Sequence, residues 1–185
     1  VLERYHKNFQ RAGAGLQASD KERMAEISQR LATLGTQFAQ NMLKDEADYQ
    51  LVLETEEDRA GLPAFLLAAA AEAARDRGLE GKHVITLSRS SIEPFLQFSS
   101  NRAVREVAFK AWAARGENGG ETDNRKIAAE TLELRSEKAK LLGFDTFADF
   151  KLDDSMAKTP ASVRELLTKV WSPAVARARA EEDKL

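Results

Sequence analysis

The sequence predicts an all-α fold: a multi-helix lobe with at most one small two-stranded element. Apolar residues return at three- and four-residue intervals over much of the chain, as on the buried face of a helix. Serine, threonine or asparagine precedes several of these stretches and glycine follows them, and these are the residues that begin and end helices. With 185 residues the chain is long enough to bury a substantial core, and we expect one domain over residues 1–185.

The first helix is predicted in the opening stretch VLERYHKNFQRAGAGL, and Gly13 and Gly15 would end it because glycine readily adopts the left-handed conformation. A longer helix follows. Ser19 and Glu22 have the spacing of a capping box, in which both side chains accept free backbone N–H groups. The residues behind them form an apolar stripe of about six turns: Met24, Ile27, Leu31, Leu34, Phe38 and Met42.

Two short segments favour strands because they are rich in β-branched and aromatic residues: YQLVLE at 49–54 and HVITLS at 83–88. We expect them to pair. Between them a helix is predicted at 63–77, closed by Gly78. Its run AFLLAAAA is far shorter than the roughly 20 apolar residues of a bilayer span, so we interpret it as a buried helix face.

Residues 102–115 are predicted to form the next helix, capped by a residue within SSN at 99–101. After the loop at Gly119-Gly120, Thr122 or Asp123 would cap a further helix that stops at Gly143. The expected apolar positions of these two helices are Val104, Val107, Ala108, Ala111 and Trp112, then Ile127, Leu134, Leu141 and Leu142.

Two short signals begin the last predicted helices. Thr146 and Asp149 repeat the capping-box spacing over FADFKL. Thr159 precedes Pro160, and proline is favoured at the first position of a helix because its missing N–H would be free there in any case.

The charge balance excludes some partners. The chain has 28 basic and 30 acidic residues, so nothing electrostatic favours nucleic acid or an anionic membrane, and we expect neither. Cysteine is absent, which excludes disulfides, thiolate zinc sites and cysteine nucleophiles and fits a cytoplasmic location. Because the chain starts at Val1 and its last residues continue a helical pattern, we expect it to be a segment of a longer protein.

No catalytic, cofactor-binding or metal-binding residue is predicted. His6 and His83 have no second histidine at helical spacing, and we interpret both as surface or edge residues. The carboxylate clusters at 54–58, 152–154 and 181–183 are typical of solvated faces rather than of acid/base pairs.

Other candidate residues are also interpreted as structural. Residues RSS at 89–91 lack a glycine-flanked elbow and a histidine base, so they predict a turn with helix-capping hydroxyls. The Gly119-Gly120 pair lacks the lysine of a phosphate loop. The stems of Arg135 and Lys138 are expected to pack beside an apolar stripe, and two aromatic residues are expected in the core: Trp112 and Trp171.

Five ordered blocks of the sequence resemble a known family. They are AGLPAFLLAAAAEAARDRG, VITLSRSSIEPFLQFSSNRAVREVAFKAWAARGENGGETDN, LELRSEKAKLLGF, FADFKLDDSMAKTP and LLTKVW. Together they resemble the non-catalytic, mostly helical part of the thimet-oligopeptidase-like zinc metallopeptidases, and most of all the bacterial peptidyl-dipeptidase type. The resemblance is close over residues 60–171 and looser outside them.

The resemblance implies an almost wholly helical protein in which this N-terminal, non-catalytic portion forms one wall of a narrow channel for short peptides. It implies zinc and the hydrolysis of short peptides in the intact enzyme. The family's His-Glu-x-x-His motif has no match here, so we expect the fragment to bind no zinc, to be inactive alone and to self-associate through the surface facing the missing catalytic half. A helical protein-interaction module without enzymatic activity remains the alternative.

Overall fold

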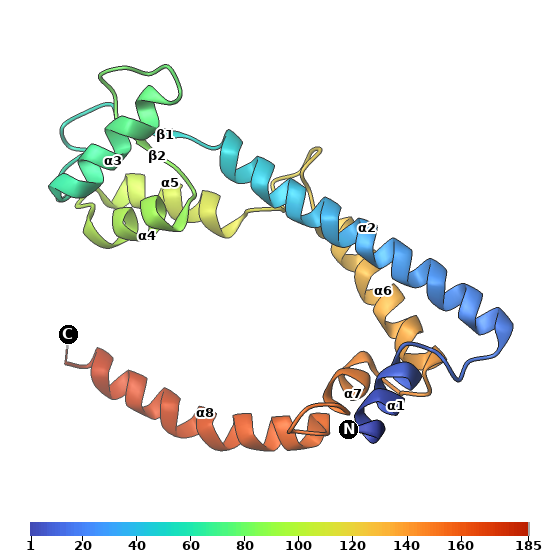
Figure 1. The fold of residues 1–185 in the computed structure, drawn as a ribbon. Helices are drawn as coiled ribbons and strands as arrows, with labels where there is room; N and C mark the ends of the chain where they lie inside the picture. Colours follow the sequence, from blue (N-terminus) through green and yellow to red (C-terminus); the bar gives the residue numbers. More distant parts are fainter. Residues whose placement is uncertain (185) are drawn as a thin grey trace. The chain divides into compact units, whose positions relative to one another are not determined.

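The computed structural model describes residues 1–184, which form helices and one two-stranded sheet (Figure 1). The predicted all-α class with one small strand pair is confirmed. The elements in chain order are α1 (Leu2–Arg11), α2 (Ala18–Asp48), β1 (Leu51–Val52), α3 (Ala64–Arg75), β2 (Val84–Ile85), α4 (Arg89–Phe98), α5 (Arg102–Ala113), α6 (Arg125–Leu141), α7 (Phe147–Leu152) and α8 (Pro160–Glu182).

The chain divides into two compact units. The first unit consists of residues 1–32 together with the described residues from 129 onward, and the second consists of residues 33–128. Helices α2 and α6 each contribute residues to both. The expectation of a single helical lobe over the whole chain stays a prediction.

The core of the second unit lies where α3, α4 and α5 meet the sheet (Figure 1). The two strands are antiparallel, with Leu51 opposite Ile85 and Val52 opposite Val84, as their composition predicted. The buried residues that pack together here are Leu53, Leu62, Leu66, Ala70, Ile85, Leu87, Ile92, Phe95 and Ala108.

Helix α4 is the element that the sequence did not predict. Residues 89–91, expected to be a turn, begin this helix, and Ser88 occupies its N-cap position. Pro94 lies inside it and removes one backbone hydrogen bond. Because proline also lowers the local helix propensity, the sequence does not predict a helix here. Complete burial of Ile92 and Phe95 outweighs that loss, because burying two such side chains contributes about 3–6 kcal/mol.

The predicted cap of α5 is confirmed at Asn101, whose side-chain oxygen accepts the backbone N–H groups of Ala103 and Val104. Val107, expected on the buried stripe of this helix, is instead 53% exposed. Trp112 packs against the core of the second unit, as predicted.

A close backbone approach joins the turn before α3 to the segment between α4 and α5. The N–H of Ser100 donates to the carbonyl of Ala60 at 2.9 Å. Gly61, next in the chain, has φ +81°, and a Cβ at this position would collide with the carbonyl oxygen of Phe98 and with Ser100. Glycine is therefore required here for both conformation and space.

The loop between α5 and α6 is held against the end of α2 by polar contacts. Asp45 accepts the backbone N–H of Gly116 at 2.7 Å, the Asn118 amide at 3.1 Å and the hydroxyl of Thr122. Asn124 is buried, and its side chain donates to the carbonyl of Phe38 and accepts from Asn41 at 2.9 Å. This loop is thus a fixed part of the second unit.

Two residues were candidates to cap α6, and the structure separates them. Asp123 accepts the backbone N–H of Arg125, the first helical residue, at 2.9 Å. The hydroxyl of Thr122 donates to Asp45 instead. Of the two candidates, Asp123 is thus the one whose side chain bonds to the start of the helix, although the N-cap position directly before Arg125 belongs to Asn124.

In the first unit, α2 and α6 are joined by two arginine–glutamate pairs. Arg23 contacts Glu137 through Nε at 2.7 Å and Nη2 at 2.9 Å, and Arg30 contacts both carboxylate oxygens of Glu130. Met24 and Ile27 of the predicted α2 stripe are buried here.

The capping box predicted at Ser19 and Glu22 is wrong. Helix α2 already begins at Ala18, and the N–H of Lys21 bonds to the carbonyl of Gln17, so Ser19 lies inside the first turn. Phe38, the fifth of the six residues in the predicted stripe, is 41% exposed.

The signals for the last two helices are confirmed. Thr146 and Asp149 form the predicted capping box, and Thr159 caps α8 with Pro160 at its start. Helix α8, however, has no buried residue, and Trp171 is 71% exposed, so its predicted place in the core is wrong. None of the helices within residues 1–184 combines the length and the apolar character needed to cross a bilayer.

Candidate functional site

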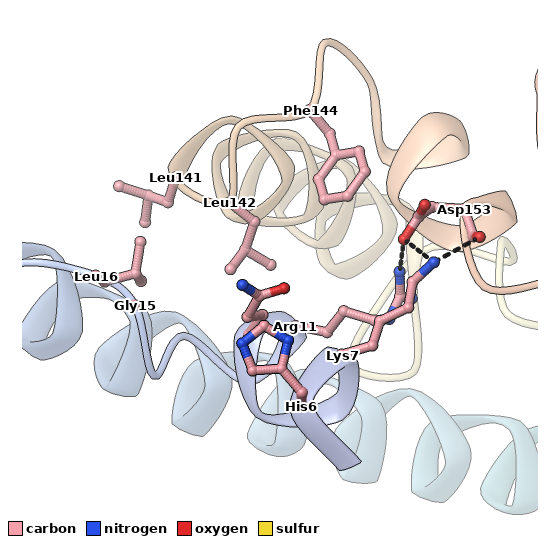
Figure 2. A pocket seen from close by; sticks show the side chains of 10 residues that line it. His6, Lys7, Arg11, Gly15, Leu16, Leu141, Leu142, Phe144 and Asp153 are labelled. Carbon is pink, nitrogen blue, oxygen red and sulfur yellow. Dashed lines mark hydrogen bonds and ion pairs between the residues drawn. The ribbon is translucent and has the colours of Figure 1, made fainter. Parts of the chain in front are cut away.

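A cavity of about 650 Å³ lies within the first unit, between α1, the turn that follows it, and the ends of α6 and α7 (Figure 2). This volume falls in the range of small-molecule sites, roughly 300–1,000 Å³. The lining residues are His6, Lys7, Gln10, Arg11, Gly15, Leu16, Leu141, Leu142, Phe144 and Asp153.

The polar side of the cavity comes from one face of α1. His6, Lys7, Gln10 and Arg11 are spaced by one, three and four residues, which places them on neighbouring positions of the helix surface. The helix ends just beyond them, where Gly13 has φ +96° and turns the chain toward Leu16. The predicted end of the first helix at Gly13 is thereby confirmed.

Lys7 and Arg11 hold α1 to the end of α7. Lys7 Nζ donates to the Asp153 carbonyl at 3.0 Å and contacts Oδ2 of the same residue at 2.9 Å. Arg11 Nη1 donates to the Phe150 carbonyl at 2.7 Å and to Asp153 Oδ2 at 3.2 Å. The guanidinium also lies over the Phe150 ring, 4.2 Å from its centroid.

Asp153 is the acceptor that these cations share (Figure 2). Its hydrogen bond from Lys7 lowers the pKa of its carboxyl, and the charges of Lys7 and Arg11 lower it further against the opposing effect of burial. The group is therefore ionised at neutral pH. Two cations face one anion, so the polar side of the cavity carries excess positive charge.

The apolar side of the cavity comes from the end of α6. Gly143 has φ +81°, and the N–H of Phe144 bonds to the carbonyl of Ala139 while that of Gly143 bonds to Lys140, which is a Schellman closure. The predicted stop at Gly143 is confirmed. This turn places the half-buried side chains of Leu141, Leu142 and Phe144 along the cavity (Figure 2).

The two histidines lie in different units. His6 is exposed at the rim of the cavity, and within residues 1–184 its ring has no hydrogen-bond partner. His83 is half-buried just before β2, and its carbonyl accepts the N–H of Leu53 at 2.9 Å. This placement fits a residue at a strand edge.

The first acidic cluster is exposed at residues 54–57, as expected of a solvated face, whereas Asp58 and the second cluster make fixed polar contacts. Asp58 accepts the N–H groups of Glu54 and Thr55, at 3.1 and 3.0 Å, and these bonds, led by those from Thr55, lower its pKa. Asp153 and Asp154 pair with basic residues of α1. In the third cluster, exposed Glu181 pairs with Arg177 on α8, as expected of a solvated face.

Two other candidate residues have structural roles. The hydroxyl oxygen of Ser91 accepts the N–H of Thr86 at 3.0 Å, next to the start of α4. The guanidinium of Arg135 lies over the Phe147 ring, 5.3 Å from its centroid, so its charged end makes this contact; the predicted packing of the Arg135 and Lys138 stems stays a prediction.

Within residues 1–184, no three histidine, cysteine, aspartate or glutamate side chains gather in a way that could hold a metal ion. The expectation that this chain has no catalytic or metal-binding residue stays a prediction. The sequence did not indicate the cavity, because its two sides are more than a hundred residues apart and only the fold brings them together.

Comparisons with known proteins identify the relatives of the chain. Residues 95–185 match the sequence model of peptidase family M3. Oligopeptidase A of Haemophilus influenzae is 37% identical over 90% of this chain and 25% of its own length. Dipeptidyl carboxypeptidase of Escherichia coli is 36% identical over 98% of this chain and 27% of its own length.

A plant relative shows the same pattern. Probable cytosolic oligopeptidase A of Arabidopsis thaliana is 34% identical over 89% of this chain and 24% of its own length. The chain belongs to peptidase family M3, as the resemblance predicted. It spans about a quarter of the length of the curated relatives it matches.

Proposed function

We propose that this chain is the N-terminal, non-catalytic portion of a zinc-dependent oligopeptidase of the peptidyl-dipeptidase type, which hydrolyses short peptides. The observation that carries the proposal is identity of 36–37% over nearly the whole chain with relatives named oligopeptidase A and dipeptidyl carboxypeptidase. Its single helical lobe forms part of the wall of a peptide channel in the longer protein. The cytoplasm is its proposed location, and one relative is named as probably cytosolic.

The zinc of that enzyme has no place among the described residues of this chain. Neither His6 nor His83 has a second histidine or a carboxylate pair arranged around it, and no other cluster of suitable ligands is found in residues 1–184. We therefore assign no chemical step to these residues. The contribution proposed for this segment is to shape the channel and so to control which peptides enter it.

Helix α8 supplies the surface that the rest of the longer protein covers in this proposal. Leu166, Leu167, Val170 and Trp171 are spaced so that they share one face, and each is at least 55% exposed. Apolar side chains clustered in this way mark surfaces that contact another protein segment. The chain alone is expected to self-associate through this face.

The test is peptide hydrolysis. The 185-residue chain, supplied with zinc and a quenched fluorogenic peptide, should show no turnover, whereas a protein of the relatives' full length that contains it should cleave the peptide and lose activity with a chelator. Turnover by the chain alone that the substitutions His6→Ala or His83→Ala abolish would contradict the proposal. Absence of cleavage by the longer protein would favour the alternative, a helical protein-interaction module with α8 as its contact surface.

A further inference from the structure

The cavity of the first unit has free hydrogen-bond donors at its charged end. An ammonium group has three donors, and Lys7 uses two of them on Asp153. A guanidinium group has five, and the hydrogen bonds of Arg11 all come from Nη1, which leaves the donors on Nε and Nη2. The side chains of His6 and Gln10, also at the cavity, have no hydrogen-bond partner within residues 1–184.

The charges at this end favour an anion over a cation. Lys7 and Arg11 carry two positive charges, and Asp153 is the single carboxylate that lines the cavity. The neighbouring carboxylate, Asp154, is already paired with Arg4. A carboxylate that accepts from Lys7 and Arg11 would form charge-assisted hydrogen bonds, which are about twice as strong as neutral ones.

The other end of the cavity suits an apolar group. Leu16 and Leu141 line it well apart from the ion pairs in Figure 2, with Leu142 next in the chain, whereas Phe144 stands closer to Asp153. A volume of about 650 Å³ is in the range of small-molecule sites. One end therefore selects a carboxylate and the other an aliphatic or aromatic side chain.

We propose that this cavity binds a small amphiphilic carboxylate: an apolar amino acid or the C-terminal residue of a short peptide. The ligand's carboxylate accepts from Lys7 and Arg11, and its side chain lies against Leu141 and Leu142. The choice of a peptide-derived ligand rests on the proposed peptidase function. The binding site itself does not, because it is built from contacts within one unit.

The experiment is a titration of the 185-residue chain with N-acetyl-leucine, followed by amide chemical shifts in NMR, beside the same titration with N-acetyl-leucinamide. We expect saturable shifts near His6 and Gln10 with the acid, and binding of the neutral amide that is weaker by about 10-fold or more. N-acetyl-glycine, which lacks the apolar side chain, should also bind more weakly.

Two substitutions test the assigned residues. Lys7→Gln removes one donor, and Gln10→Glu places a negative charge at the cavity without breaking any described contact, so it should leave the fold intact. Both substitutions should weaken the binding of N-acetyl-leucine at least 5-fold and change the binding of N-acetyl-leucinamide little. Lys169→Gln is the matched control, since it lowers the net charge by the same amount on the exposed surface of α8.

The proposal is overturned if the acid does not bind, if acid and amide bind equally, or if Gln10→Glu and Lys169→Gln have the same effect. Binding to the 185-residue chain that disappears in the longer protein also contradicts it, because another part of that protein then fills the cavity. Each of these outcomes leaves the peptide-hydrolysis test unaffected, so the two proposals fail separately.

Discussion

The carboxylate of Asp45 accepts the backbone N–H of Gly116 at 2.7 Å and so anchors the loop between α5 and α6 to the end of α2. Asp45→Ala should lower the free energy of unfolding by about 1–3 kcal/mol, because the donors of Gly116, Asn118 and Thr122 lose their acceptor. Urea denaturation measures this. Asp48→Ala, at a 65% exposed carboxylate that pairs with Lys44, is the control and should change stability by less than about 0.5 kcal/mol.

Acid should weaken the same loop. Burial raises the pKa of Asp45, but the hydrogen bonds from Thr122, Gly116 and Asn118 outweigh it and hold the pKa below its ordinary value. The hydrogen bond from Arg125 lowers the pKa of Asp123 to about 2. A lowered folded-state pKa means that the unfolded chain binds more protons, so this stability is present above the unfolded pKa and is lost as the pH falls from about 4 to about 2.

The measurement for this pH effect is the difference in unfolding free energy between the unmodified chain and Asp45→Asn. We expect the difference to be largest near neutral pH and to shrink below about pH 4, where the unmodified carboxylate is protonated on unfolding. An unchanged difference between pH 7 and pH 3 would show that the charge of Asp45 contributes nothing.

Gly61→Ala should be among the most destabilising single changes in the second unit. The residue has φ +81°, and the new methyl group would collide with the backbone carbonyl of Phe98, which no side-chain rotation relieves. We expect a loss of about 3 kcal/mol or more. Gly81→Ala is the matched control: its φ is +78°, but nothing lies within 4 Å of the added Cβ.

The control isolates the collision from the backbone conformation. Gly81→Ala should cost only the strain of a left-handed alanine, about 1–2 kcal/mol. If the two substitutions destabilise the chain equally in thermal unfolding, the close approach between Gly61 and Phe98 has no energetic weight.

The sequence predicted most helices because their signals are local. Thr146 with Asp149, Thr159 with Pro160 and Asn101 each act within one turn, and the structure confirms all three. Helix α4 was missed because Pro94 lowers its local propensity, whereas the burial of Phe95 that stabilises it depends on tertiary contacts.

Long-range contacts explain the other differences. The cavity was not predictable because Arg11 meets Phe150 and Asp153 only after folding. The same reason applies to Trp171. An apolar stripe predicts that one face of the helix is buried, but it does not say whether the residues that bury it belong to this chain.

A charge on the apolar face of α8 should separate folding from association. Trp171→Glu should leave the chain's unfolding free energy within about 0.5 kcal/mol, because the side chain is 71% exposed and packs against little within this chain. It should nevertheless abolish the expected self-association in light scattering. Lys169→Glu, on the same helix, is the control. If both variants abolish self-association equally, the added negative charge, and not the loss of the apolar Trp171 side chain, causes the effect.

Helix α8 runs for 23 residues with no buried side chain, and Pro173 interrupts its backbone hydrogen bonds. Most helices in proteins are stabilised mainly by packing against other elements. A helix without such packing is only marginally stable in water. Formation of the last three turns of α8 is then coupled to the association of its apolar face with another surface. The helical signal of the chain in far-ultraviolet circular dichroism should therefore increase with protein concentration.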